Sequence, residues 1–269
     1  MSRIERCFKA LRSDGRKALV PYISAGAPTA QQTLELLHGI VEAGADLIEL
    51  GVPFSAPMAD GPVVQQAAER ALAGGMTLAG GLALVSELRA SNSSVPVVLM
   101  GYLNPIECMG YQAFAAAAAT AGVDGVLIVD LPPEEARDWL DELSARDLDP
   151  IFLLSPTTSP ARIERICADA RGYVYYVSLK GVTGAAHLDT DAVARQVATI
   201  RALTDLPVGV GFGISDPQSA KAVASVADAV VVGSAIVSRI EAHAGEPKRM
   251  MTEVCGLVSA MRSEMDMIK

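Results

Sequence analysis

The sequence has few of the residues that bind metals or form disulfides. It contains four cysteines and three histidines in 269 residues, and no CxxC pair. None of the histidines stands at a ligand spacing from a cysteine. A zinc site or a disulfide framework is therefore not expected. The residues concerned are Cys7, Cys108, Cys167, Cys255, His38, His187 and His243.

Basic charge and long apolar runs are also scarce. The formal net charge is -9, and lysine and arginine form no stripe that would follow a phosphate backbone. No apolar run reaches the roughly 18 residues of a membrane span. Residues 1–17 are amphipathic and lack the apolar core of a signal peptide. We expect a cytoplasmic protein that binds neither nucleic acid nor membrane.

Aromatic residues make up 4% of the chain, whereas 51% is hydrophobic. The core must therefore consist largely of alanine, valine, leucine and isoleucine, as in a buried parallel sheet covered by helices. An α/β barrel takes about 250 residues as one domain. No low-complexity linker interrupts the sequence, so we predict a single domain over residues 1–269.

Short β-branched runs alternate with longer alanine-rich segments along the whole chain, which is typical of repeated βα units. The eight expected strands are residues 18–24, 45–50, 95–100, 125–129, 150–154, 172–177, 207–211 and 229–233. Eight strands in continuous alternation predict an α/β fold of the (β/α)8 TIM-barrel type.

Three additions to the barrel are expected: a helix near the N-terminus, a second helix within residues 63–90, and an extra helix after the eighth strand. The main alternative is a doubly wound open sheet, which uses the same units. Its dinucleotide fingerprint is absent, because residues 209–213 lack the GxGxxG spacing and the acidic residue that follows it.

Two carboxylates are candidates for acid-base chemistry at the C-terminal ends of the strands, where barrel enzymes have their active sites. Glu49 lies in an apolar run, where burying a charge is costly. Asp60 follows in residues 51–62, a loop stiffened by three prolines. The structural alternatives are a Glu49 ion pair at the barrel rim and a helix-capping role for Asp60.

Three other strand ends carry glycine and small polar residues. Residues 211–215 and 233–237 let backbone N–H groups approach an anion, and a helix begins after Gly233. Residues 178–185 resemble a lid with glycine hinges. Just before this lid, one of Tyr175 and Tyr176 must point into the barrel and the other outward, and alternation alone leaves the choice open.

Five motifs in order resemble the α subunit of tryptophan synthase over most of the chain. They are residues 47–55, 57–62, 181–184, 211–215 and 233–237. The resemblance implies retro-aldol cleavage of indole-3-glycerol phosphate to indole and glyceraldehyde 3-phosphate. It assigns proton transfer to Glu49 and the ring nitrogen to Asp60. Tyr175 and Thr183 complete the implied catalytic group.

The resemblance also implies the remaining contacts with the substrate. The apolar indole slot is expected from Tyr22, Met100, Leu127 and Phe212, and the phosphate site from Gly184, Gly213, Gly233 and Ser234. No metal or organic cofactor is needed for this chemistry. The implied partner is a pyridoxal-phosphate β subunit that receives the indole in an α2β2 complex.

The chain departs from the family at Ala56, where an aspartate associated with coupling between the subunits is usual. Lys180 and the preceding Leu179 stand where some relatives carry arginine. We expect intrinsic cleavage to survive and activation by the partner to be weakened. Alternatives are a stand-alone lyase, a mainly regulatory subunit, and a sugar-phosphate isomerase or epimerase, although the last would lack the loop at residues 53–62.

Overall fold

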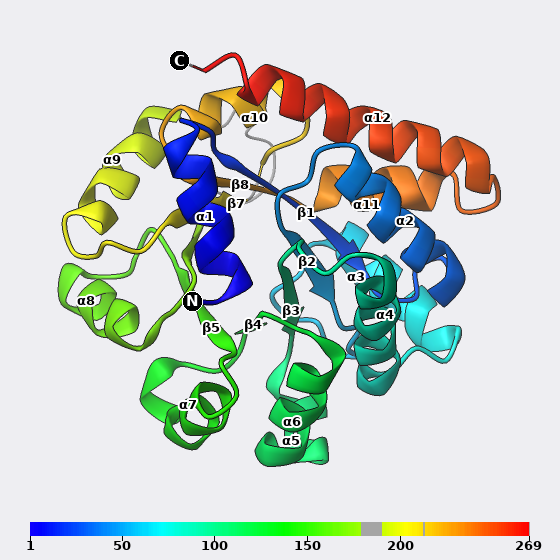
Figure 1. Ribbon diagram of the computed structural model, residues 1–269, viewed down its shortest axis with the longest axis horizontal. Helices are drawn as coiled ribbons and strands as arrows, with labels where there is room; N and C mark the ends of the chain where they lie inside the picture. The colour runs from blue at the N-terminus through cyan, green and yellow to red at the C-terminus, as the bar shows by residue number, and fades with distance from the viewer. Residues whose placement is uncertain (179–189, 212, 269) are drawn as a thin grey trace.

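Eight parallel strands close into a barrel in the computed structural model, which describes residues 1–178, 190–211 and 213–268 (Figure 1). Each strand pairs with the next, and β8 pairs with β1. The predicted barrel is confirmed and the open sheet is excluded. The strands are β1 (Ala18–Ser24), β2 (Ile48–Gly51), β3 (Val97–Gly101), β4 (Gly125–Ile128), β5 (Asp149–Leu154), β6 (Val174–Val177), β7 (Val208–Gly211) and β8 (Ala229–Val232).

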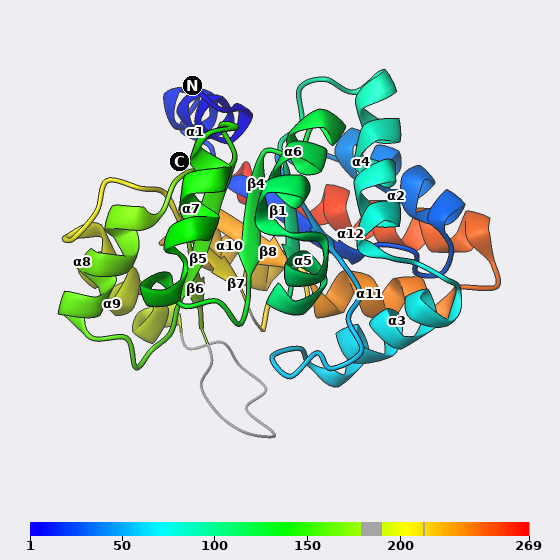
Figure 2. The same ribbon diagram turned by 90° about the horizontal axis from the view of Figure 1, so that it is seen from below.

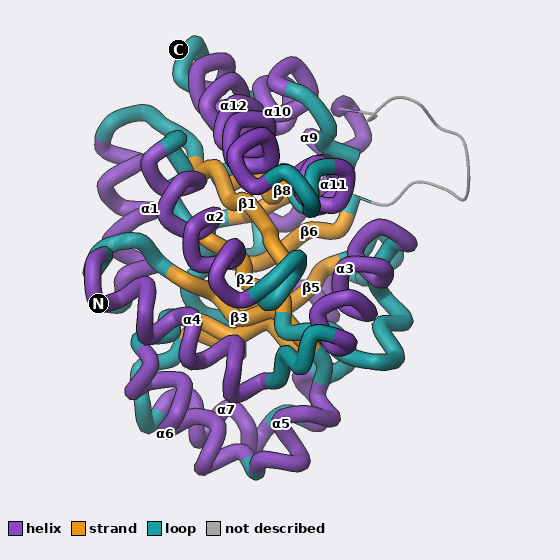
Figure 3. Tube along the Cα trace, turned by 90° about the vertical axis from the view of Figure 1, so that its right-hand side faces the viewer, coloured by secondary structure: helices purple, strands orange, loops and turns teal. Residues whose placement is uncertain are grey.

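Helices surround the strands on the outside (Figure 3). They are α1 (Arg3–Ser13), α2 (Ala30–Glu42), α3 (Pro62–Ala73), α4 (Leu78–Ser91), α5 (Leu103–Met109), α6 (Tyr111–Ala121), α7 (Arg137–Ser144), α8 (Pro160–Asp169), α9 (Thr190–Arg201), α10 (Pro217–Ala224), α11 (Ser234–Ala242) and α12 (Pro247–Met265), with a 3-10 turn, η1 (Pro133–Glu135), before α7. The helix at the N-terminus and the extra helices after β2 and β8 are confirmed.

The second helix after β3 and the 3-10 turn after β4 were not predicted from the sequence. Two helices, α5 and α6, follow β3, because Gly110 adopts φ 86° and separates them. After β4, the expected helix opens with the turn η1 and becomes α-helical at Arg137. These differences involve helix boundaries and leave the order of the strands unchanged.

Side chains inside the barrel come from alternate positions of each strand. Tyr175 packs in the interior with Tyr173, whereas Tyr176 packs outward in the layer between strands and helices. The structure therefore shows that Tyr175 points into the barrel and Tyr176 points outward, which the sequence had left open. Ile4 and Phe8 of α1 belong to the same interior cluster, so α1 closes the N-terminal end of the barrel.

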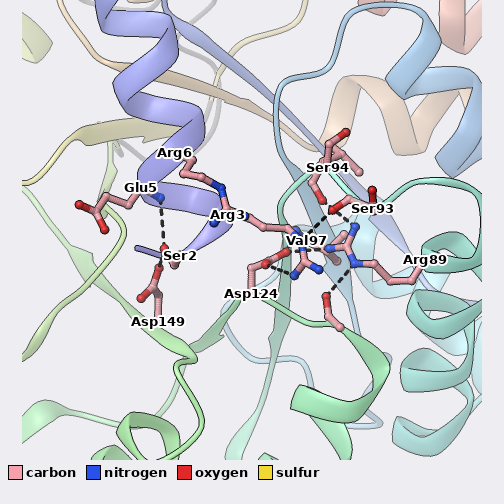
Figure 4. Close-up of polar contacts among 12 residues, drawn as sticks. Ser2, Arg3, Glu5, Arg6, Arg89, Ser93, Ser94, Val97, Asp124 and Asp149 are labelled. Carbon is pink, nitrogen blue, oxygen red and sulfur yellow. Dashed lines mark hydrogen bonds and ion pairs between the residues drawn. The ribbon is translucent and has the colours of Figure 1, made fainter.

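Polar contacts hold α1 against this end (Figure 4). Arg3 pairs with Asp124 at 2.8 Å, and Ser2 donates to Asp149 at 2.6 Å. Asp124 also pairs with Arg89 of α4 at 2.7 Å. In Figure 2, α1 lies at one end of the barrel, and α3 with the segment before it lies at the other.

Three aspartates each stand just before a strand. Each accepts a backbone N–H from the neighbouring strand that comes earlier in the chain. Their carboxylates accept N–H groups at 2.9, 2.8 and 3.0 Å. Each also pairs with an arginine. The acceptor–donor pairs are Asp46–Leu19, Asp124–Val97 and Asp228–Val208. The N-terminal ends of the strands are therefore fixed by ion pairs.

Candidate active site

A cavity of about 340 Å³ lies at the C-terminal ends of the strands. It brings together eight of the residues predicted from the sequence: Tyr22, Glu49, Asp60, Met100, Tyr175, Gly213, Gly233 and Ser234. The loop after β2 and the loops after β7 and β8 thus meet over the barrel mouth.

Four predicted residues are not placed in this cavity. Leu127 is fully buried in the barrel interior and is not among the described residues that line the cavity. Thr183, Gly184 and Phe212 lie outside the described residues, as do Leu179 and Lys180.

Glu49 is 1% exposed on β2. Its Oε1 accepts a hydrogen bond from the Tyr173 hydroxyl at 2.5 Å. Its Oε2 has no hydrogen-bond partner within the described part of the chain. Burial raises the pKa of Glu49 to about 7, although the Tyr173 hydrogen bond opposes the shift. Both the acid and the carboxylate are therefore populated at neutral pH.

Asp60 is half-buried in the loop between β2 and α3. Its Oδ2 accepts a hydrogen bond from the Tyr102 hydroxyl at 3.0 Å, and the same hydroxyl accepts the Ala59 N–H at 3.0 Å. Burial raises the pKa of Asp60, and the bond from Tyr102 pulls it back. The Phe54 ring stacks on Tyr102 at 5.2 Å between centroids, which supports this arrangement from the far side.

Tyr173 and Tyr102 were missed in the sequence, although both touch a candidate carboxylate. Tyr173 is two residues before Tyr175, so the strand period placed both on one face and could have identified it. Tyr102 follows the end of β3, which is a position that the barrel rule favours. Its contact with Asp60 depends on how the loop after β2 folds back, and that has no local signal.

The start of α11 is suited to an anion. Ser234 begins the helix after Gly233, and among the described residues no side chain caps its first turn. Ser234 and Ala235, at the start of this nine-residue helix, line the cavity, where the helix dipole favours a negative charge. Gly213 adopts φ 76° beside them, a conformation that favours glycine.

Gly51 and Gly211 are required because neighbouring tyrosine side chains leave no room for a Cβ. A Cβ on Gly211 would lie 1.8 Å from the Tyr175 hydroxyl oxygen, and one on Gly51 would lie 2.1 Å from that of Tyr22. Both tyrosines thus lie across the neighbouring strands without a side chain in the way. The two glycines make room for the cavity walls.

A second cavity of about 690 Å³ adjoins the first and shares Asp60, Met100 and Tyr175 with it. Apolar side chains from β4 and β5, including Ile128 and Phe152, form its wall. A flat apolar group that contacts Asp60 would therefore have space in this second cavity.

Within residues 1–178, 190–211 and 213–268, no cluster of three or more histidine, cysteine or acidic side chains could hold a metal ion. In the same part of the chain, no single helix is long and apolar enough to cross a membrane. Helices α3 and α4 reach the required length only when taken together across a 94° bend.

The fold and the cavity define a (β/α)8-barrel enzyme with two carboxylates and an uncapped helix start at the C-terminal face. A family model for the tryptophan synthase alpha chain matches residues 8–266. The chain belongs to this family. It is a carbon-carbon lyase of tryptophan biosynthesis, which cleaves indole-3-glycerol phosphate to indole and glyceraldehyde 3-phosphate.

Individual relatives agree over the full length. The tryptophan synthase alpha chain of Thioalkalivibrio sulfidiphilus (strain HL-EbGR7) is 60% identical over 266 residues, covering 99% of this chain and 100% of the relative. That of Nitrosococcus oceani is 58% identical, with 99% and 98% covered. The solved alpha subunit of Legionella pneumophila str. Paris superposes with a TM-score of 0.92 at 42% identity, with 99% of each chain covered.

Proposed function

We propose that Glu49 carries out both proton transfers of the cleavage and that Asp60 stabilises the indole ring nitrogen. The observation that supports this most directly is the pair of carboxylates in one cavity, each held by a tyrosine hydroxyl. Among the described residues, neither carboxylate pairs with a cation.

The reaction needs one proton delivered to C3 of the indole ring and one removed from the side-chain hydroxyl, with no net change in protons. A single group with a pKa near the working pH can do both. Burial raises the pKa of Glu49 to about 7, and its unpartnered Oε2 is the atom that would reach the substrate.

Protonation at C3 places positive charge on the ring nitrogen. An ionised Asp60 that accepts the ring N–H would then stabilise the transition state more than the ground state. The Tyr102 hydroxyl, donating at 3.0 Å, orients Asp60 and favours its ionised form. Tyr175 and Thr183 complete the proposed catalytic group.

We assign the phosphate to the start of α11, with Gly233, Ser234 and Gly213 as its contacts and Gly184 as a fourth. The indole ring would lie against Tyr22 and Met100, which line the cavity, and Phe212. Leu127 would support this wall from the barrel core.

We also propose an α2β2 complex in which indole passes to a β subunit that carries pyridoxal phosphate, while this chain needs no cofactor of its own. A chain of the tryptophan synthase of M. tuberculosis, solved in an aminoacrylate-bound form, superposes with a TM-score of 0.87 at 34% identity, with 98% and 100% covered. We further propose a single domain over residues 1–269, working in the cytoplasm where its phosphorylated substrate would be made.

The test is release of indole from indole-3-glycerol phosphate by the purified chain, with and without a β subunit. Glu49→Gln should reduce kcat on the order of a thousandfold, because it removes the proton-transfer group and keeps its shape. Wild-type kcat in Glu49→Gln would overturn the assignment. A wild-type chain active only with the partner would exclude a stand-alone lyase, and inactivity in both assays would favour the regulatory role.

Ala56 lies exposed in the loop that carries Asp60. We expect Ala56→Asp to leave cleavage by the isolated chain unchanged and to increase its activation by a β subunit, since the added charge can contact the partner. The ratio of kcat with and without β measures this. Identical, strong activation of both chains would show that position 56 does not control coupling.

A further inference from the structure

Helices α3 and α11 form one wall of the active-site cavity. They pack side by side (Figure 2). Val64 of α3 and Ser238 of α11 both line the cavity. Helix α3 begins directly after Asp60 and Gly61, and α11 begins at Ser234. The groups proposed to hold the indole nitrogen and the phosphate are therefore attached to two neighbouring helices.

Gln65 ties the Asp60 loop to the first turns of α3. Its Nε2 donates to the backbone oxygen of Asp60 at 2.8 Å and to that of Pro57 at 3.3 Å. These bonds supplement the helix start at Gly61, which among the described residues has no side-chain cap. The loop therefore follows α3 if α3 moves.

Arg70 ties α3 to α11. Its Nη2 lies 2.6 Å from Oε2 of Glu241, whose side chain is 15% exposed. The other carboxylate oxygen, Oε1, is buried and has no hydrogen-bond partner among the residues described. Glu241 also stands in the last turn of α11, where the helix dipole disfavours a negative charge. The ion pair with Arg70 therefore joins the last turn of α11 to α3.

We propose that Gln65, Arg70 and Glu241 are positioning residues, which fix Asp60 relative to the phosphate-binding end of α11. Gln65 fastens the loop to α3, and the ion pair fastens α3 to α11. The substrate must contact Asp60 and the start of α11 at the same time. Its reacting bond is therefore aligned only if the distance between these two sites is correct. This inference rests on the proposed roles of Asp60 and Ser234.

The consequence is a change in rate without a change in phosphate affinity. Inorganic phosphate would occupy the proposed phosphate site, whose contacts do not include Asp60, so its binding does not depend on where Asp60 lies. Cleavage depends on both, and misplacement by about 1 Å can cost a hundredfold in rate. We expect Arg70→Met to lower kcat about tenfold while the Kd of inorganic phosphate changes by less than about twofold.

The matched control is Lys221→Met. Lys221 of α10 pairs with Glu264 of α12 at 2.9 Å, and its side chain is 40% exposed, against 45% for Arg70. This pair does not border the cavity. Its removal should lower Tm by an amount similar to Arg70→Met and leave kcat unchanged, with kcat measured well below both melting temperatures and phosphate binding measured by calorimetry.

Two further variants separate positioning from simple destabilisation. The exchange Arg70→Glu with Glu241→Arg should recover most of kcat, because it restores the ion pair. Glu241→Gln removes the charge with little change in shape and should lower kcat in the same direction, which provides the test if Arg70→Met does not fold. Unchanged kcat in Arg70→Met, or in Glu241→Gln, would overturn the proposal. Failure of the catalytic assignment would instead appear as full activity in Asp60→Asn, whatever the result at Arg70.

Discussion

The carboxylates at the two ends of the barrel have different partners. At the N-terminal ends of the strands, Asp46, Asp124 and Asp228 each pair with an arginine and accept a backbone N–H. At the C-terminal ends, Glu49 and Asp60 accept hydrogen bonds from tyrosine hydroxyls, and neither has a cationic partner among the described residues. The first group holds strand ends together, and the second is the pair proposed to take part in the reaction.

The groups that contact a carboxylate affect its pKa. A guanidinium and a backbone N–H both favour the ionised form of a carboxylate that they contact. Burial raises the pKa of Asp46, and both Leu19 N–H and Arg262 oppose that rise. For Glu49, one neutral hydroxyl opposes burial, and the pKa reaches about 7. With no cation paired to it among the described residues, Glu49 has a pKa that suits the proposed proton transfers.

Asp60→Asn should give the largest effect at the C-terminal end. The amide keeps an acceptor for Tyr102 but carries no charge, so kcat should fall on the order of a thousandfold while folding is little changed. Indole release and thermal unfolding measure the two quantities. A large loss of Tm with normal kcat would make Asp60 a structural residue like those at the other end.

Asp124→Asn should show the opposite behaviour. The amide can still accept Val97 N–H, but Arg89 and Arg3 lose their counter-charge, which should lower the free energy of unfolding by about 3 kcal/mol. The kcat of the folded enzyme should be unchanged. Urea unfolding tests this, with exposed Asp141→Asn as a control that should change little. Equal stability of Asp124→Asn and Asp141→Asn would show that the ion pairs of Asp124 do not stabilise the N-terminal end of the barrel.

Glu49→Gln should change how stability depends on pH. The pKa of Glu49 is about 7 in the folded chain against an ordinary value of 4.5, so the folded state binds the proton more tightly. That contribution is present below the unfolded pKa and is lost as pH rises through about 7. The glutamine variant lacks the loss, so it should gain on wild type by at most about 3 kcal/mol between pH 4.5 and 8. The measurement is the urea midpoint of each protein across this pH range. A constant difference between wild type and Glu49→Gln would contradict the raised pKa of Glu49.

Tyr173→Phe should give the smallest effect. It removes the hydrogen bond that lowers the pKa of Glu49, so the ionisation seen in the pH profile of kcat/KM should move upward from about 7. Tyr176→Phe is the matched control, since Tyr176 lies on the same strand and packs outward. A shift of equal size in both variants would mean that Tyr173 does not act through Glu49.

Much of the fold could be read from the sequence, because local patterns determine it. The eight strands were placed within three residues of their observed starts, and β2 begins at Ile48 instead of Ala45 since Ala45 closes the turn after α2. The site residues that share a cavity were named from motifs at strand ends. Tyr102 was missed, because its partner Asp60 is 42 positions away and only the folded loop brings them together.

By itself, the sequence determined the barrel and the two carboxylates. Strand periodicity, turn residues and the cost of burying Glu49 are properties of short segments, so they can be identified from the sequence. The tertiary structure alone decided which tyrosine faces inward, which hydroxyl contacts each carboxylate, and that α3 packs beside α11. Those properties depend on the register of the barrel and on helix packing, which are set by contacts between residues far apart in the chain.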